Sequence, residues 1–169
     1  MDTNSIQKEL YLECQKDGSS SAEIVRDLFR RGATPDWYYD KRLMFTIRDV
    51  PKDVISAFID AGMDLQHPDY DYGTLLDRVL INRCTDTEEI IRMVFDKFPS
   101  ININKPYGPS LKTSLHWAAQ CESIDIIKIL LEFGADSSVK DRDGCTPRDY
   151  LPTKSRDEFD KLIQEMQLR

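Results

Sequence analysis

The sequence predicts an all-α solenoid, a stack of short helix pairs that forms one domain over residues 1–169. Two observations predict this fold. The segment Thr113–Asp141 contains two apolar helical patterns, closed by Gly134, and its opening threonine recurs 33 residues later at Thr146. The same order of helix, turn, helix and glycine recurs upstream in weaker form. Repeats of this period are typical of solenoids in which each unit buries its apolar face against its neighbours.

The best-defined unit contains two short helices. Leu115, Ala118 and Ala119 follow the spacing of one helix face, and the alanines allow a neighbouring helix to approach closely. Ile126, Ile127, Leu130 and Leu131 form a second apolar stripe. Gly134 follows where a helix commonly ends in a left-handed residue. The pattern therefore predicts a helix, a tight turn, a second helix and an extended loop.

This unit resembles the ankyrin repeat, whose signature is a 33-residue period and the motif T-P-L-H-x-A. The matching residues lie in both helices, in the closing turn and in the next hairpin: Thr113, Leu115, His116, Ala118, Ala119, Ile126, Ile127, Leu130, Leu131, Gly134-Ala135-Asp136, Asp143, Gly144, Thr146 and Pro147. The unit departs from the motif at Ser114, where proline is usual, and at Glu122-Ser123, where Gly-His is usual. The resemblance implies an ankyrin-repeat solenoid of about five units with degenerate end units.

The five expected units lie roughly at 4–36, 37–69, 70–109, 110–142 and 143–169. First helices are expected over Ser5–Lys16 and Leu43–Asp49, and second helices over Ala22–Ala33, Asp53–Asp64 and Glu89–Phe98. Gly62 and Gly134 are 72 residues apart, more than two periods, so we expect insertions in the third unit near Arg83–Asp86 and Lys105–Leu111. A last helix is expected over Arg156–Leu168, with Ser155 and Glu158 as a capping box.

The charge distribution argues against nucleic acid and membrane surfaces as partners. The chain has 23 Lys and Arg against 30 Asp and Glu, a net charge of −7, and no basic block that could follow a row of phosphates. No apolar run approaches the roughly 18–20 residues of a membrane span, and residues 1–9 do not resemble a signal peptide. We therefore expect a cytoplasmic protein, with the nucleus as the alternative, that is monomeric when free.

The sequence also lacks the motifs of metal, cofactor and catalytic sites. Its cysteines, Cys14, Cys84, Cys121 and Cys145, form no C-x-x-C pair, and its two histidines, His67 and His116, have no metal-ligand spacing. It contains no glycine-rich phosphate loop and no catalytic motif. We expect no metal, no cofactor and no enzymatic activity. The resemblance implies that His116 bonds to neighbouring backbone, a structural role.

Aromatic residues gather in the loops between the expected units and predict a partner-binding surface. They are Trp37, Tyr38, Tyr39, Tyr70, Tyr72 and Tyr107, with Trp117 on a first helix, and Asp40 and Asp71 stand beside them. Tyrosine and tryptophan are enriched in binding hot spots. Residues 34–72 hold eight Asp against four Lys and Arg, so the expected partner is basic and partly apolar. The alternatives are that the aromatic residues pack on the first helices and that the aspartates only cap turns.

The resemblance implies protein–protein recognition through the concave face and the hairpin fingers, without catalysis. Two forms of this function are open. In the first, the chain is an adaptor or scaffold that recognises a peptide or a disordered segment. In the second, it is a dedicated inhibitor or effector that blocks one enzyme or signalling protein. Fold similarity alone does not choose between them, because the function depends on surface residues.

Overall fold

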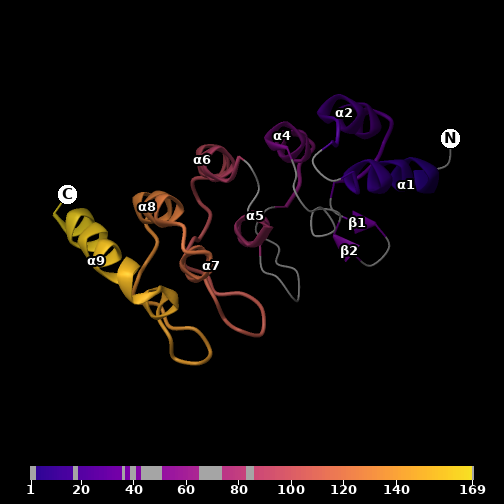
Figure 1. Cartoon of the computed structure of the whole chain (residues 1–169). Helices are drawn as coiled ribbons and strands as arrows, with labels where there is room; N and C mark the ends of the chain where they lie inside the picture. The colour runs from indigo at the N-terminus through magenta and orange to yellow at the C-terminus, as the bar shows by residue number, and fades with distance from the viewer. Residues whose placement is uncertain are drawn as a thin grey trace.

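The computed structural model describes residues 3–16, 19–35, 51–64, 74–82 and 86–168, and the backbone of residues 37–38 and 41–42. Short helices follow one another along an elongated, curved stack, with the N-terminus at one end and the C-terminus at the other (Figure 1). The all-α solenoid predicted from the sequence is confirmed. In the described part of the chain it also includes one short antiparallel hairpin, β1 (Trp37–Tyr38) with β2 (Lys41–Arg42).

The helices stand in two rows. One row, which we call the outer row, contains α2 (Ala22–Arg30), α4 (Lys52–Asp60), α6 (Thr87–Lys97), α8 (Ile124–Glu132) and α9 (Thr153–Gln167), and each of these helices contacts the next. The other row contains α1 (Thr3–Cys14), α5 (Leu75–Asn82), α7 (Ser114–Gln120) and the 3₁₀ helix η1 (Pro147–Tyr150). The loops that lead into α7 and η1 project to the side away from α6 and α8 (Figure 1). We call the surface formed by these loops, α5, α7 and η1 the finger side.

The observed helices α1, α2, α4 and α6 confirm four of the helices expected from apolar spacing. The helix expected over Leu43–Asp49 lies outside the described residues, as do positions 83–85 of the expected insertion near Arg83–Asp86. The segment of the second expected insertion, Lys105–Leu111, lies in the loop before α7.

Three helices of the outer row end in the same way. After α2, α4 and α8 a glycine in the left-handed region donates its N–H to the carbonyl three residues back, and the next residue donates to the carbonyl five residues back: Gly32, Gly62 and Gly134. These paired bonds satisfy helix-end carbonyls that would otherwise be unpaired. Helix α6 ends differently, because Phe98 donates to Val94 at 2.9 Å and Pro99 follows.

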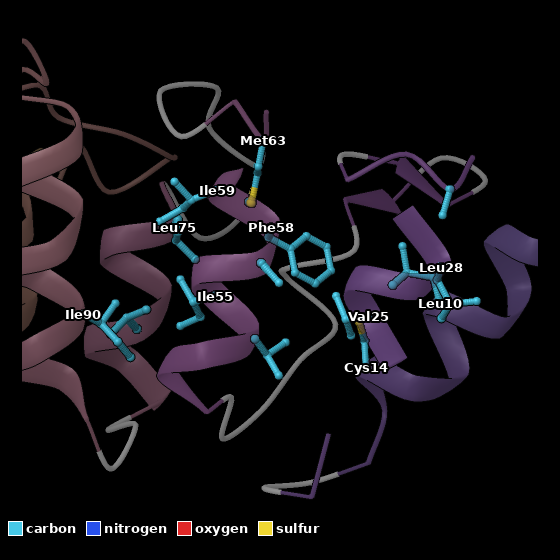
Figure 2. Close-up of a cluster of buried hydrophobic side chains, with 14 of the residues drawn as sticks. Leu10, Cys14, Val25, Leu28, Ile55, Phe58, Ile59, Met63, Leu75 and Ile90 are labelled. Atoms are coloured by element: carbon cyan, nitrogen blue, oxygen red, sulfur yellow. The ribbon is translucent and has the colours of Figure 1, made fainter. Parts of the chain in front are cut away.

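The core consists of two clusters that meet at the α5–α6 pair. The first cluster runs from α1 and α2 through α4 to Leu75, Val79, Ile90 and Val94 (Figure 2). The second cluster begins at the neighbouring positions Leu76, Leu80, Ile91 and Phe95 and continues to α7, α8 and α9. Helices α5 and α6 therefore bury side chains toward both sides, as internal units of a one-dimensional stack must.

Cys14 belongs to the first cluster as a packing residue. Its side chain is buried beside Leu10 and Val25, and burial raises the pKa of the Cys14 thiol to about 12. The thiol is therefore protonated at neutral pH.

The start of the last helix differs from the prediction. Helix α9 begins at Thr153 after Pro152, so the capping box expected from Ser155 and Glu158 is wrong. The N–H of Ser155 donates to the carbonyl of Pro152 at 2.9 Å, which places Ser155 inside the first turn. The guanidinium of Arg156 bonds to the carbonyl of Leu151 at 3.0 Å and holds this turn against η1.

Candidate partner-binding surface

Two loops on the finger side are joined to each other. We call them the 105–112 finger and the 141–145 finger. In the 105–112 finger, Tyr107 and Lys112 pair as an isolated β-bridge, with the Tyr107 N–H 3.1 Å from the Lys112 carbonyl. In the 141–145 finger, Asp141 donates to the Cys145 carbonyl at 2.9 Å. The N–H of Arg142 donates to the carbonyl of Ser110 at 2.9 Å, so the two fingers form one continuous surface.

The helices below the fingers share one kind of N-cap. A threonine hydroxyl precedes each helix, and the third helical residue returns a hydrogen bond to the threonine N–H: Thr74 with Asp77, Thr113 with His116 and Thr146 with Asp149. This reciprocal arrangement satisfies two of the helix N–H groups that lack an intrahelical partner. At Thr113 and Thr146 it fixes where the two fingers enter α7 and η1.

His116 is held on both ring nitrogens. Its Nδ1 accepts from the N–H of Thr113 at 3.1 Å, and its Nε2 lies 3.1 Å from the carbonyl of Cys145, to which it donates as the neutral tautomer. Burial lowers the pKa of His116 below its ordinary value, against the opposing effect of the Cys145 carbonyl. The fully buried imidazole therefore connects α7 to the next finger, as the resemblance implied.

The ammonium of Lys112 lies between two aromatic rings of the finger side. Its Nζ is 4.9 Å from the centre of the Trp117 ring on α7 and 4.1 Å from that of Tyr150 on η1. The same Nζ donates to Oε1 of Gln120 at 2.8 Å. Cation–π contacts of this kind are worth about 0.5–2 kcal/mol each. They fasten the base of the 105–112 finger to α7 and η1.

The 141–145 finger is organised around the carboxylate of Asp141. It accepts from the N–H groups of Asp143 at 3.0 Å and Cys145 at 2.9 Å, and from the hydroxyl of Tyr150. Burial acts to raise the pKa of Asp141, but the bonds from Tyr150, Cys145 and Asp143 outweigh it and the pKa is lowered. The same contact raises the pKa of Tyr150. The carboxylate of Asp141 thus stabilises the conformation of the finger through these hydrogen bonds.

Comparisons with known proteins agree with this geometry. The sequence pattern of the ankyrin repeat matches residues 111–142, which include α7 and α8. Residues 111–142 of the chain therefore form an ankyrin repeat.

The chain is also similar to plant proteins with ankyrin repeats. A BTB/POZ domain and ankyrin repeat-containing protein NBCL from Lotus japonicus is 38% identical over 90 residues, which cover 50% of this chain and 18% of that protein. Regulatory protein NPR6 from Arabidopsis thaliana is 37% identical over 71 residues, which cover 42% of this chain and 15% of that protein. The chain thus matches less than a fifth of the length of these relatives.

The structure describes two of the side chains predicted to bind a partner. Tyr107 lies in the 105–112 finger, half-buried beside Lys105, whose Nζ is 5.3 Å from its ring centre, and burial raises the pKa of Tyr107. Trp117 lies on α7 and packs partly against the second cluster. Trp37 and Tyr38 form the backbone of β1, and their side chains lie outside the described part. The remaining predicted residues also lie outside it: Tyr39, Asp40, Tyr70, Asp71 and Tyr72.

Several residues of this surface were missed by the sequence analysis. Lys112 and Tyr150 belong to no motif. They are 38 positions apart in the sequence, and only the stacking of consecutive units brings their side chains into contact. The N-caps at Thr74 and Thr146 did have a readable signal, since threonine followed three residues later by aspartate is a variant of the capping box. That signal would have placed Asp77 and Asp149 at the starts of α5 and η1.

Membrane spans and metal clusters are both absent from the described residues. Among residues 3–168 with the gaps given above, no helix is both long and apolar enough to cross a membrane. The same residues contain no group of three or more His, Cys, Asp or Glu side chains that could hold a metal ion.

Proposed function

We propose that this ankyrin-repeat protein is a protein-recognition module that binds its partner through the finger side and has no catalytic activity of its own. The observation that carries the proposal is the continuous surface of the two fingers, α7 and η1, on which Tyr107, Trp117 and Tyr150 lie half-exposed near Lys105 and Lys112. Aromatic rings and cations on a braced surface are typical of binding hot spots. The names of the relatives, which include regulatory proteins, also support it.

The environment of His116 supports the absence of catalysis. A general base must have a free nitrogen within reach of the proton that it removes. Both nitrogens of His116 are already bonded, to Thr113 and to the Cys145 carbonyl, and the imidazole is completely buried. This histidine therefore serves the stack and cannot activate a nucleophile.

We extend the same surface to the fingers near the N-terminus, on the basis of the sequence and the five-unit division. The proposed contact residues there are Trp37, Tyr38, Tyr39, Asp40, Tyr70, Asp71 and Tyr72. The acidic composition of residues 34–72 favours a partner that is basic and partly apolar at this end. Trp37→Ala, Tyr39→Ala and Tyr72→Ala should each weaken binding, at least one by about 2 kcal/mol, with little effect on stability.

Affinity purification of the full chain from its native cells, followed by mass spectrometry, tests the proposal. Lys105→Glu on the 105–112 finger is compared with Lys128→Glu, a matched change of an exposed lysine on α8 in the outer row. Partner recovery should fall with Lys105→Glu and Tyr107→Ala and should survive Lys128→Glu, at unchanged melting temperature. Recovery that depends on Lys128 and not on the finger variants would contradict the proposal.

The same purification separates the two forms of the function. An adaptor should recover a partner whose binding segment is a linear peptide and whose activity is unchanged. A dedicated inhibitor or effector should recover a folded enzyme or signalling protein, and adding the chain should lower that protein's activity.

A further inference from the structure

Leu111 occupies a position in its finger where the next finger has a glycine. Leu111 and Gly144 each stand two residues before the N-cap threonine, Thr113 or Thr146. Each closes the same turn, since Leu111 donates to the Gly108 carbonyl at 3.2 Å and Gly144 donates to the Asp141 carbonyl at 3.1 Å. Both have a positive φ, 53° for Leu111 and 80° for Gly144. The fold thus requires the left-handed region here, and a leucine fills it at a steric cost that glycine avoids.

The leucine does not join the core in return for this conformation. Its side chain is 47% exposed and belongs to neither core cluster. A single exposed leucine is ordinary on a protein surface. An exposed leucine in an unfavourable backbone region is unusual, because glycine or asparagine would suit both the backbone and the solvent. Strained residues of this kind are concentrated at functional sites.

The finger that presents Leu111 is braced on three sides. The Tyr107–Lys112 bridge closes its base, the Arg142 N–H holds the Ser110 carbonyl, and the Lys112 ammonium lies between Trp117 and Tyr150. A side chain on a braced loop loses little further freedom on binding, which is the condition for a strong anchor.

The charges around the leucine indicate what faces it. Residues 105–112 contain Lys105 and Lys112 and no acidic residue. In the adjoining finger Arg142 and Asp143 are exposed, while the carboxylate of Asp141 is bonded to Tyr150. The surroundings of Leu111 are therefore net positive, in contrast to the acidic residues 34–72.

We infer that Leu111 is an anchor residue, which inserts into an apolar pocket, rimmed by carboxylates, on a protein partner. This inference rests on the proposed function and names the chemistry of the partner at the C-terminal end of the same surface. The backbone strain at Leu111 is retained because the leucine serves binding and not stability.

A display library tests this inference even while the partner is unidentified. Folded fragments of the organism's own proteins, displayed on yeast, are sorted for binding to the full chain, and the sorted pool is then stained with variants. Leu111→Gly and Leu111→Asn keep the turn, whereas Leu12→Gln changes a leucine that is 54% exposed on α1. Staining should fall at least tenfold with both Leu111 variants and less than twofold with Leu12→Gln.

Two further measurements complete the test. The melting temperature of Leu111→Gly should equal or exceed that of the wild type, because the turn favours glycine. Lys105→Glu should weaken the pool's binding several-fold if the partner's rim is acidic. Undiminished staining by Leu111→Gly, or a clear drop in its melting temperature, would overturn the inference while leaving the proposed function standing. Undiminished or stronger staining by Lys105→Glu would overturn the acidic rim of the partner's pocket. A library from which the wild-type chain enriches nothing would contradict both.

Discussion

Ser114 and Asp77 are joined across the interface between α7 and α5. The Ser114 hydroxyl donates to Oδ1 of Asp77 at 2.6 Å, and the other carboxylate oxygen accepts from the N–H and hydroxyl of Thr74 at 2.8 and 2.9 Å. One unit later, His116 spans the equivalent interface to the Cys145 carbonyl. In α5, Asp77 stands at the N3 position, where the ankyrin motif has histidine. In α7, Ser114 stands at the first helical position, where the motif has proline. These two departures from the motif are therefore coupled in space.

We predict that Ser114→Ala destabilises the protein by about 1.5–3 kcal/mol, because it removes a buried hydrogen bond to a charged group. The loss should be smaller in an Asp77→Asn background, where the bond between the two side chains is neutral. Urea unfolding of the wild type, both single variants and the double variant measures the coupling, which we expect to exceed about 0.5 kcal/mol.

A matched control for this cycle is present in the chain. The Ser138 hydroxyl donates to Asp136 at the same distance, 2.6 Å, but the pair is exposed. Ser138→Ala should change the free energy of unfolding by less than about 0.5 kcal/mol. Equal losses for Ser114→Ala and Ser138→Ala would show that the buried link carries no special stability.

The buried carboxyl also predicts a pH dependence. Burial raises the pKa of Asp77, although the bonds from Ser114 and Thr74 oppose the rise. A carboxyl with a higher pKa in the folded state binds its proton more tightly there, so its contribution to stability falls as pH rises from about 4 through the raised value. Asp77→Asn removes this titration. The stability of the wild type relative to the variant should therefore decline with pH over that range, and parallel pH profiles would contradict the assignment.

Glu122 offers a test of backbone strain outside the two fingers. Helix α7 ends with the same paired bonds as α2, α4 and α8, but Glu122 takes the left-handed position with φ 56°. We predict that Glu122→Gly stabilises the protein by about 0.5–1 kcal/mol, because the exposed glutamate loses no packing. Glu122→Ala keeps the strained backbone and should not stabilise. Equal unfolding midpoints for the two variants in urea would assign any gain to the lost charge.

The third expected unit should open more easily than the fourth. Helix α6 lacks the glycine that closes α8, and the chain around it contains the predicted insertions. In a stack where each unit contacts only its neighbours, the weakest unit limits cooperativity. Amide hydrogens of Ile90–Phe98 should exchange faster than those of Ile126–Leu131. Slower or equal exchange in Ile90–Phe98 would show that burial toward both clusters compensates for the missing cap.

The sequence predicted those helices whose signals are local. Apolar spacing and a following glycine place α2 and α4 within four residues of their observed bounds, and the apolar stripe Ile126–Leu131 lies inside α8. The start of α9 was predicted wrongly because Ser155 has the side chain of a preferred N-cap, whereas the observed N-cap Pro152 makes no side-chain cap bond. The contact of Arg156 with the end of η1, which accompanies the observed start, is not visible as a motif.

The finger side was less predictable, for a physical reason. The departure at Ser114 was visible in the sequence, but its partner Asp77 is 37 residues away and is met only when the units stack. The positive φ of Leu111 results from the turn that joins the finger to α7, and leucine is not typical of such turns. Composition could indicate that aromatic residues gather in loops, but not which of them face solvent.

Hydrogen exchange of the full chain with and without the partner recovered by affinity purification tests the central claim most directly. We predict that binding slows exchange in residues 105–113, in residues 141–150 and in α7. Exchange in the outer-row helices α2, α4, α6 and α8 should not change. Protection confined to the outer-row helices, with the fingers unaffected, would contradict recognition through the finger side.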